Sequence, residues 1–380
     1  IIVSGLERGT FSLWGFYLAR ARRIIPALLV LCLTLLILGW FWLPSADYKV
    51  LGTHAATALA FVSNMQFWRE AGYFDTASHE KWLLHTWSLS VEWQFYILLP
   101  LGCLLLWHWL GRRGVKLALI AAGLLSLALS IYVSQRWPSA AFYLLPTRAW
   151  QMLAGGGVWW LTRQHAMSSR WGIVAEATGL LSIALAVVLF DTSLAWPGIY
   201  ALVPVLGAML VLAANRQHSW FTSNVIARHL GASSYSIYLW HWPLVVVLTY
   251  AGEQDNLGWV VLGLLFSLLL GEASLRWVEN PTRKGLTPLS INKQSWVLGT
   301  AVVMAGLLAV GARYQHVEGR IDPAIDLIAN ESLNLKPRRD ECFTTSGETS
   351  KSCVYGGDDV RAIVIGDSHA DAITTAVQAA

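Results

Sequence analysis

Charged side chains are scarce in this sequence. Asp, Glu, Lys and Arg make up 13% of the 380 residues, about half of the roughly 25% that is typical of soluble domains. Hydrophobic residues make up 55%, the mean hydropathy is positive, and 21 residues are Trp. This composition excludes an ordinary soluble domain and predicts a polytopic membrane protein. The net charge of +4 is small and gives no support to nucleic-acid binding.

Cysteine is scarce as well, with four residues in the chain. Cys32 and Cys103 lie in apolar runs and are predicted to be packing residues. Cys342 and Cys353 are separated by ten residues, and no His or further Cys stands at a spacing that suits a metal site. We therefore predict no metal ligands and, in an oxidising compartment, a disulfide between Cys342 and Cys353.

A phosphate-binding loop is also missing. Gly155, Gly156 and Gly157 have no P-loop Lys nearby, so we interpret them as permitting close helix packing. The cluster Arg20, Arg22 and Arg23 has a plain explanation, because cytoplasmic arginines commonly flank membrane helices. The planar guanidinium groups of these arginines also suit phosphate groups.

Nine apolar runs approach the roughly 20 residues that a helix needs to cross a bilayer. They cover residues 24–43, 86–109, 116–134, 146–162, 172–190, 198–214, 231–250, 257–275 and 296–313. If all nine cross, most Lys and Arg of the connecting segments fall on one side, which the positive-inside rule assigns to the cytoplasm. The chain after about residue 314 is then external.

A tenth run, over about 50–67, is weaker. It contains His54, Asn64 and Gln66. If it were counted as a crossing, every later loop would change sides, and Lys and Arg would no longer be concentrated on the cytoplasmic side. We therefore predict that this segment is a re-entrant or surface-lying helix.

One predicted membrane helix carries ionisable side chains. At about 100° per residue, His85, Ser88, Glu92 and Tyr96 share a narrow face. An ionisable group in a bilayer core is costly, so such a face normally lines a cavity within the protein. Glu92 is a candidate to accept a proton or to orient a catalytic imidazole, and His85, near the external end, is placed for the acceptor. The alternative is a structural pair that holds two helices together.

A second polar stripe lies on the predicted 231–250 helix. Ser234, Tyr238 and His241 stand at i, i+4 and i+7, and Pro243 follows with the capacity to kink the helix. An interfacial aromatic belt explains the neighbouring tryptophans but not the histidine. Arg148, at a predicted membrane boundary, is either a cation that extends to the interface or a ligand for an anionic group.

The sequence changes character after residue 313, where charge and Pro increase as in a linker that enters an aqueous domain. The stretch 360–372 contains a β-branched run, Gly366, Asp367 and Ser368. Ser368 would then sit on a turn between a strand and a helix, near amides that can stabilise an oxyanion. An ordinary turn with Ser as helix cap explains this pattern equally well, and the spacing is not that of the G-x-S-x-G esterase elbow.

Five motifs together resemble a known family. They are the arginine-rich segment 16–27, HTWSLSVEWQFY at 85–96, PTRAW at 146–150, SYSIYLWHWPL at 234–244 and RWVENP at 276–281. Their order resembles that of the acyltransferase 3 membrane proteins, and the GDSH text at 366–369 resembles the first block of an SGNH hydrolase domain. On this resemblance the chain begins within the family's second helix, so the Arg and His of the first helix have no counterpart here, and the segment alone is expected to be inactive.

The resemblance implies an all-α polytopic membrane helix bundle followed by the start of an α/β, SGNH-like extracytoplasmic domain. The implied domains are the acyltransferase domain at 1–285, an additional transmembrane helix at 286–315, a periplasmic linker with the disulfide at 316–355, and the start of the SGNH-like domain at 356–380. The implied protein lies in the bacterial inner membrane with its C-terminal part in the periplasm.

The implied activity is O-acylation, most simply O-acetylation, of a cell-surface carbohydrate such as lipopolysaccharide O-antigen. The donor is cytoplasmic acyl-coenzyme A, acetyl-coenzyme A in the simplest case, which is a substrate and not a resident cofactor. Arg20, Arg22 and Arg23 would then receive its phosphates, and Asp367 and Ser368 would serve the external transfer. Two other classes stay open: a transporter or flippase for a lipid-linked glycan or acyl group, and a membrane-anchored binding protein.

Overall fold

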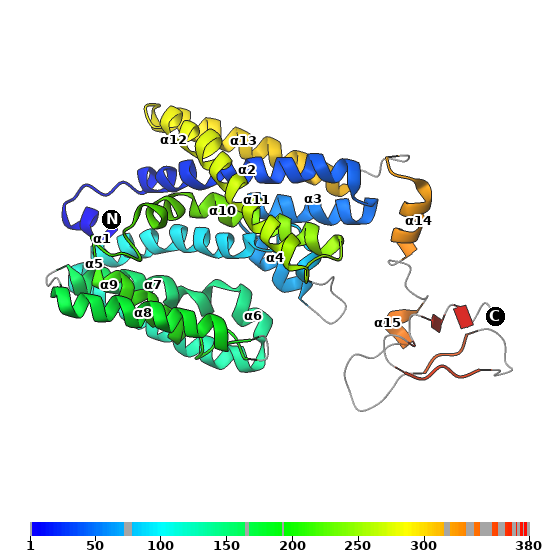
Figure 1. Ribbon diagram of the computed structural model, residues 1–380, viewed down its shortest axis with the longest axis horizontal. Helices are drawn as coiled ribbons and strands as arrows, with labels where there is room; N and C mark the ends of the chain where they lie inside the picture. Colours follow the sequence, from blue (N-terminus) through cyan, green and yellow to red (C-terminus); the bar gives the residue numbers. More distant parts are fainter. Residues whose placement is uncertain are drawn as a thin grey trace.

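The structure is a computed structural model. It describes residues 2–71, 78–163, 167–191, 194–314, 320–331, 338–342, 352–355 and 362–366, together with 370, 373–374 and 376–377. Within these ranges the chain forms helices and connecting segments and no strand. Figure 1 shows a bundle in which most helices run nearly along one axis, and a C-terminal segment that extends away from it.

Five helical segments among the described residues are long and apolar enough to cross a membrane. They are α2 (Leu13–Trp42), α5 (Thr86–Arg136), α8 (Ser169–Leu189), the segment Leu257–Leu286, which comprises α11 (Leu257–Ser274), η2 (Leu275–Glu279) and α12 (Asn280–Leu286), and α13 (Ile291–Tyr314). Such segments characterise a multi-pass membrane protein. The shorter or more polar helices are α7 (Leu145–Thr162), α9 (Leu202–Ala214) and α10 (Val225–Tyr250).

All nine predicted runs are therefore helical, although their boundaries differ from the prediction. The runs 86–109 and 116–134 are two helices, as predicted, which meet within α5 at Gly111, where φ is 59° and ψ is −166°. Residues from both halves of α5, such as Leu99 and Leu119, line the same chamber, so the chain folds back on itself at this glycine. A positive φ is readily available to glycine alone, which explains the position of the reversal. The run 198–214 is a helix only from Leu202, too short to span about 30 Å.

The weak run 50–67 is divided between α3 (Ser45–Leu59) and α4 (Ser63–Glu70), which are separated at Phe61, where φ is 55°. Phe61 stacks on Trp93 of α5, with ring centroids 4.4 Å apart. Glu70, at the other end of α4, lies beside His54 of α3 and beside Lys81, which precedes α5. The chain thus descends beside α2, turns at Phe61 and returns beside α5, which is the geometry of a re-entrant segment.

The bundle has two parts, as Figure 1 shows: α2, α3 and α13 lie side by side, and α7, α8 and α9 form a separate layer. Helix α5 extends between these two parts, and α10 packs on α11. The continuous apolar core belongs to the first part, where Ala27, Leu31 and Cys32 of α2 are fully buried against α3 and α13. The remaining elements are α1 (Ile2–Glu7), η1 (Ser78–Glu80), α6 (Pro138–Tyr143), α14 (Pro323–Glu331) and α15 (Arg339–Cys342).

Glycines permit close helix contacts, but not at the predicted positions. A Cβ at Gly155, Gly156 or Gly157 would meet no atom within 4 Å, so our interpretation of this triplet as a packing site is wrong. The close approach occurs between α8 and α9, where a Cβ at Gly179 would lie 2.5 Å from the Gly207 carbonyl oxygen. A small-residue pattern does not reveal which helix faces it, and this caused the error.

The structure tests only some of the predictions for the C-terminal segment. Cys342 and Cys353 form a disulfide with 5.5 Å between their Cα atoms. Residues 362–365, within the predicted strand, belong to no strand in the structure. Asp367 and Ser368 lie outside the described residues, so the α/β domain and the role of these two residues stay predictions.

Candidate functional site: a polar cavity beside α5

One face of α5 lines a cavity of about 430 Å³. Ser88, Glu92 and Tyr96 all belong to this face, as the helical spacing predicts, and α7 forms the opposite wall with Arg148. The full lining consists of Trp87, Ser88, Val91, Glu92, Phe95, Tyr96, Arg148, Gln151 and Met152. Two predicted site elements, distant in sequence, therefore meet in one cavity that contains both a carboxylate and a guanidinium group.

The other face of α5 explains why this one is turned to the cavity. Ser90 Oγ lies 2.8 Å from Ser63 Oγ of α4, and Thr86 Oγ1 donates a hydrogen bond to the same Ser63 oxygen at 3.0 Å. Gln94 Nε2 donates to the side-chain oxygen of Asn64 at 2.8 Å. These buried polar contacts fix the rotation of α5 against the re-entrant pair, since breaking them would leave unsatisfied polar groups.

Glu92 lies near the middle of the cavity wall and accepts a hydrogen bond from the Tyr96 hydroxyl one turn later. The guanidinium of Arg20 lies over the opposite side of Tyr96, 5.2 Å from the ring centroid, and 5.5 Å from that of Phe16. Arg20, Tyr96 and Glu92 thus form a continuous series from the arginine cluster of α2 to the cavity. The sequence placed the arginines and the glutamate in separate motifs and did not predict this connection.

Arg148 is held rigidly in the cavity wall. Its guanidinium packs against the rings of both Trp87 and Phe142, with centroid distances of 5.1 and 4.9 Å, and Nε donates to the Phe142 carbonyl at 2.9 Å. Nη2 is buried and has no hydrogen-bond partner in the described part of the chain. A buried donor without a partner costs about 1–3 kcal/mol, so this group is well suited to bind an anionic or carbonyl oxygen. The geometry excludes the alternative that Arg148 extends to the membrane surface, because the residue is only 7% exposed.

His85 is the residue before α5 and does not line the cavity. Its buried ring packs against Tyr238 and His241 of α10, with centroids 5.2 and 5.7 Å away. Burial and the neighbouring His241 lower the pKa of His85 to about 3, so its imidazole is neutral at physiological pH. His85 and Glu92 are not joined by a hydrogen bond, which removes the simple structural pair considered above.

Tyr238 connects the two polar stripes. Its hydroxyl donates to the His85 carbonyl and lies 2.7 Å from Ser88 Oγ, a residue of the cavity wall. His241 is placed beside Tyr238 by an Nδ1 contact of 2.6 Å with the Tyr238 carbonyl. Tyr238 and His241 were predicted to line the cavity and do not: Tyr238 contacts its wall through Ser88, and His241 packs against His85 outside the lining.

Three other predicted residues have different positions. Ser234 is exposed and donates to the Gly231 carbonyl of its own helix, so it does not reach the cavity and its assignment as a cavity residue is wrong. Arg22 donates to Gln294 of α13 at 3.0 Å, and Arg23 is exposed. The arginine cluster is thus divided among three environments, and Arg20 is the member that contacts the cavity wall.

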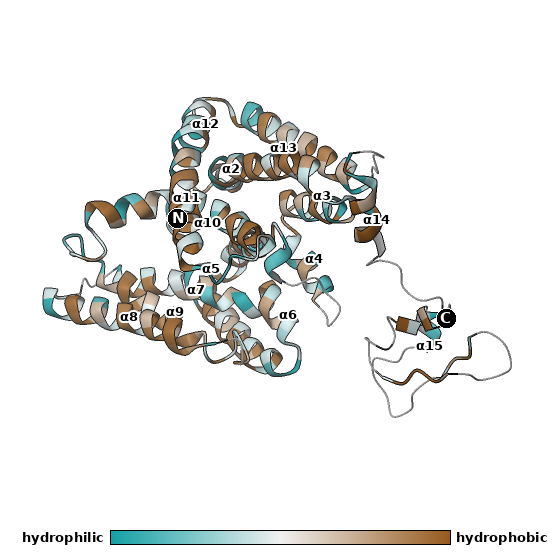
Figure 2. Ribbon diagram, turned by 45° about the vertical axis from the view of Figure 1, so that its right-hand side comes forward, coloured by the Kyte–Doolittle hydropathy of each residue, from teal (hydrophilic) through white to brown (hydrophobic). Residues whose placement is uncertain are grey.

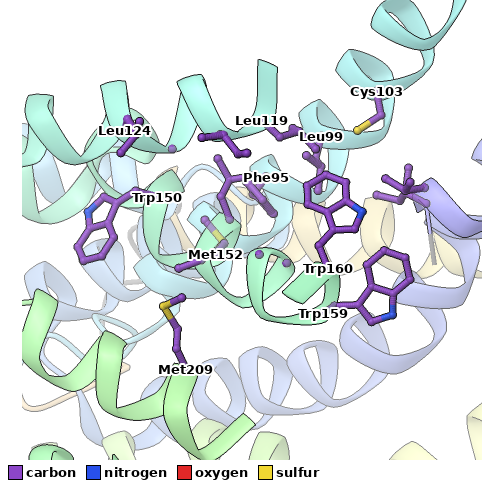
Figure 3. A pocket seen from close by; sticks show the side chains of 18 of the residues that line it. Phe95, Leu99, Cys103, Leu119, Leu124, Trp150, Met152, Trp159, Trp160 and Met209 are labelled. Atoms are coloured by element: carbon purple, nitrogen blue, oxygen red, sulfur yellow. The ribbon is translucent and has the colours of Figure 1, made fainter. Parts of the chain in front are cut away.

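An apolar chamber of about 500 Å³ adjoins the polar cavity and was not predicted. Both share Phe95 and Met152 as lining residues. Figure 3 shows these two side chains among Leu99, Leu119, Trp150 and Trp160, with no polar group at the centre. The sequence carries no signal for this chamber, because an apolar helix face has the same composition whether it faces lipid or a cavity.

A cluster centred on Glu70 was missed as well. His54 Nε2 is 3.0 Å from both carboxylate oxygens, and Lys81 Nζ and Gln66 Nε2 donate to the carboxylate at 3.0 and 2.8 Å. Burial tends to raise the pKa of Glu70, but the bonds from His54, Gln66 and Lys81 prevail and lower it to about 2. The polar residues in the weak run 50–67 were the available signal, and we used them only to judge its topology.

Comparison with known proteins identifies the family. Residues 2–272 match the family model described as an acyltransferase domain. The chain belongs to this acyltransferase family. No solved structure matches the chain.

Several relatives of this acyltransferase have names that describe acyl transfer. It is 30% identical over 294 residues to the peptidoglycan O-acetyltransferase OatA of Listeria monocytogenes, covering 72% of this chain and 47% of that protein. It is 31% identical over 328 residues to the putative membrane-bound transacylase BcsY of Komagataeibacter xylinus, covering 83% and 81%. The O-acetyltransferase OatA of Staphylococcus aureus is 27% identical over 290 residues, covering 72% and 48%. The acyltransferase chain thus spans about half the length of the OatA proteins.

Proposed function

We propose that the protein is a membrane O-acetyltransferase that transfers an acetyl group from acetyl-coenzyme A to a hydroxyl group of a cell-surface carbohydrate. The family and the names of its relatives support acyl transfer. The observation that carries the proposal within the structure is the shared cavity of Glu92 and Arg148, because it combines a proton acceptor with a rigid cation. Neither transport nor simple binding requires this pair.

The proposed chemistry uses both side chains. Glu92 accepts the proton of the attacking hydroxyl while the new oxygen–carbon bond forms at the thioester carbonyl. Arg148 Nη2 donates to the carbonyl oxygen as it becomes negative. The carbon–sulfur bond then breaks, and the proton passes from Glu92 to the departing thiolate. If the external serine Ser368 carries the acetyl group as an intermediate ester, two transfers of this kind take place, the first to the Ser368 hydroxyl and the second from it to the carbohydrate.

On the donor side, Arg20, Arg22 and Arg23 would receive the phosphate groups of coenzyme A at the cytoplasmic end. Arg20 is the member placed to connect donor binding to the cavity, because it contacts the ring of Tyr96. The positive-inside distribution supports a bacterial plasma membrane orientation with the C-terminal segment in the periplasm. The disulfide in that segment supports an oxidising compartment.

The acceptor belongs to the carbohydrates outside the membrane. Two of the relatives described above are named O-acetyltransferases, one of them of peptidoglycan. These names favour a cell-wall polysaccharide over the lipopolysaccharide O-antigen that the sequence resemblance alone placed first.

Membranes containing the full-length protein, supplied with acetyl-coenzyme A labelled in the acetyl group, test the proposal. We expect label in alkali-labile ester linkage on a glycan. Glu92→Gln should reduce this transfer by at least about 100-fold, a size typical of the loss of a general base. Glu176→Gln is the matched control, because Glu176 is a buried carboxylate paired with Arg216 at 2.6 Å outside the cavity lining. Glycan movement without ester label would contradict the proposal and favour a transporter.

A further inference from the structure

The short helix α14 (Pro323–Glu331) is fastened to the end of the membrane bundle by Arg320, which precedes it. The Arg320 guanidinium donates to the carbonyls of Gly39 and Leu43, at 3.2 and 2.6 Å, and also to that of Trp40. These carbonyls lie at the C-terminal end of α2, where the last carbonyls of a helix lack partners within it; the Gly39 carbonyl also accepts from the Leu43 N–H at 2.9 Å. Arg320 therefore caps α2 from outside its own sequence.

A second contact fastens the helix itself. The two carboxylate oxygens of Asp326 accept hydrogen bonds from the backbone N–H and the hydroxyl of Ser45, at 2.8 and 2.7 Å. Ser45 is the first residue of α3, where N–H groups are free and a negative charge is favourable. Asp326 is 9% exposed, so this polar contact is buried.

The rest of α14 has an inverted pattern. The residues at 323, 324, 325, 327 and 328 are all exposed, and all are apolar: Pro, Ala, Ile, Leu and Ile. Leu327 and Ile328 are 71% and 74% exposed, whereas Asp326 is buried. A helix on the aqueous surface of a protein turns its apolar side inward and its polar side to solvent. The opposite arrangement indicates that the medium around the outer side of α14 is not water.

The direction of α14 agrees with this conclusion. In Figures 1 and 2 it runs across the ends of α2, α3 and α13 and not along them, and its ribbon in Figure 2 carries mainly the colour of hydrophobic residues. A helix across the end of a membrane bundle lies parallel to the membrane plane. Exposed aromatic residues occur at the last turns of α2 and α13, namely Phe41, Trp42 and Tyr314. Such residues are typical of the boundary between lipid and water.

We propose that α14 is an interfacial helix that lies in the outer boundary of the bilayer, with Ile325, Leu327 and Ile328 among the lipid acyl chains and with Arg320 and Asp326 fastened to the bundle. The partner is the lipid surface. This helix holds the start of the C-terminal segment at the membrane. The inference does not depend on the proposed acyl transfer.

The test places an environment-sensitive fluorophore at single cysteines in the full-length protein in lipid nanodiscs. Ile328→Cys reports on the outer side of α14, and Asp255→Cys in the exposed loop between α10 and α11 is the control. Cys32 and Cys103 are buried and Cys342 and Cys353 are bonded to each other, so the new cysteine is the accessible one among the described residues. Lipids with a quencher near the head group, or aqueous iodide, then report the surroundings of the label.

We expect the label at position 328 to be quenched by the lipid quencher several-fold more than the label at position 255, and to be shielded from iodide. Equal access of iodide to both labels would overturn the proposal. A benzophenone at position 328 provides an independent measurement. Crosslinks to lipid support the proposal, whereas crosslinks to the C-terminal segment would show that protein covers this face and would overturn it.

Discussion

The Ser88 side chain of α5 and the Tyr238 hydroxyl of α10 lie 2.7 Å apart, and the same hydroxyl donates to the His85 carbonyl. This contact joins two polar stripes separated by about 150 residues into a single site. Because Ser88 lines the cavity and His85 does not, Tyr238 is the link through which the histidine pair can affect the cavity. Its loss should therefore be measurable as a loss of activity.

Tyr238→Phe removes both hydrogen bonds while the ring and its packing remain. We expect transfer of labelled acetyl groups to fall roughly tenfold, which corresponds to about 1.4 kcal/mol of transition-state stabilisation. Tyr235→Phe is the control on the same helix, since the Tyr235 hydroxyl donates to the Ile24 carbonyl at 2.7 Å and makes no contact with the cavity. Equal losses in both variants would mean that Tyr238 serves only helix packing.

The Glu70 cluster predicts a specific dependence of stability on pH. The pKa of Glu70 is lowered to about 2, so the carboxylate stabilises the fold above its ordinary pKa of 4.5, and this contribution is lost as the pH falls toward 2. Glu70→Gln should lower the unfolding temperature at pH 7 by roughly 5 °C, because the buried side chains of His54 and Lys81 lose their charged partner. Thermal unfolding in detergent from pH 7 to pH 3 measures the difference between the two proteins. The difference in unfolding temperature between the two proteins should become smaller below pH 4.5. A difference that does not change with pH would show that the cluster contributes through packing alone.

The sequence predicted which faces of the helices carry the chemistry, because helical periodicity is a local property. Ser88, Glu92 and Tyr96 line one cavity at the spacing that the 3.6-residue period requires. The period could not show that Arg148 faces them, or that His85 turns toward α10, because both depend on how the helices pack. Ser234 has the right period relative to Tyr238 but is exposed, since α10 is not enclosed along its full length.

Helix boundaries were predicted less well than helix faces. Hydropathy located all nine runs, including the two helices that meet at Gly111 in α5, but it could not show the conformation of the chain at this glycine. A glycine followed by two arginines looks like any loop, and its φ of 59° is a consequence of the tertiary fold. The same limit applies to the glycine triplet in α7, whose neighbours are visible only in the folded bundle.

Two glycine substitutions of the same kind should have opposite effects. Gly179→Ala places a Cβ 2.5 Å from the Gly207 carbonyl oxygen, so α8 and α9 must separate. We expect a loss of about 1–3 kcal/mol, typical of overpacking. Gly155→Ala meets no atom within 4 Å and should be neutral or stabilise the helix by up to about 1 kcal/mol. Unfolding measurements in mixed micelles compare the two variants, and equal stability would contradict the close contact of α8 and α9.

The orientation of the chain predicts where its cysteines can react. Cys342 and Cys353 are joined, and Cys32 and Cys103 are buried. In intact cells, a maleimide that does not cross the inner membrane should label none of these four before reduction, and the pair at 342 and 353 after reduction. Mass spectrometry of the labelled peptides gives the result. Failure to label this pair after reduction, with labelling only once the inner membrane is permeabilised, would place the C-terminal segment on the cytoplasmic side and reverse the topology.

Arg148 offers a sharp test of the proposed chemistry, because its charge and its geometry can be separated. Arg148→Lys keeps the positive charge but removes the planar group that packs against Trp87 and Phe142, and with it Nη2. If Nη2 binds the developing oxyanion, kcat should fall by about 100-fold or more while KM changes little, as for the loss of a single oxyanion donor. Arg216→Lys, which alters the ion pair with Glu176 outside the cavity, is the control and should leave kcat unchanged. A rise in KM with constant kcat would instead make Arg148 a ligand for substrate in its ground state, and the oxyanion would need another donor.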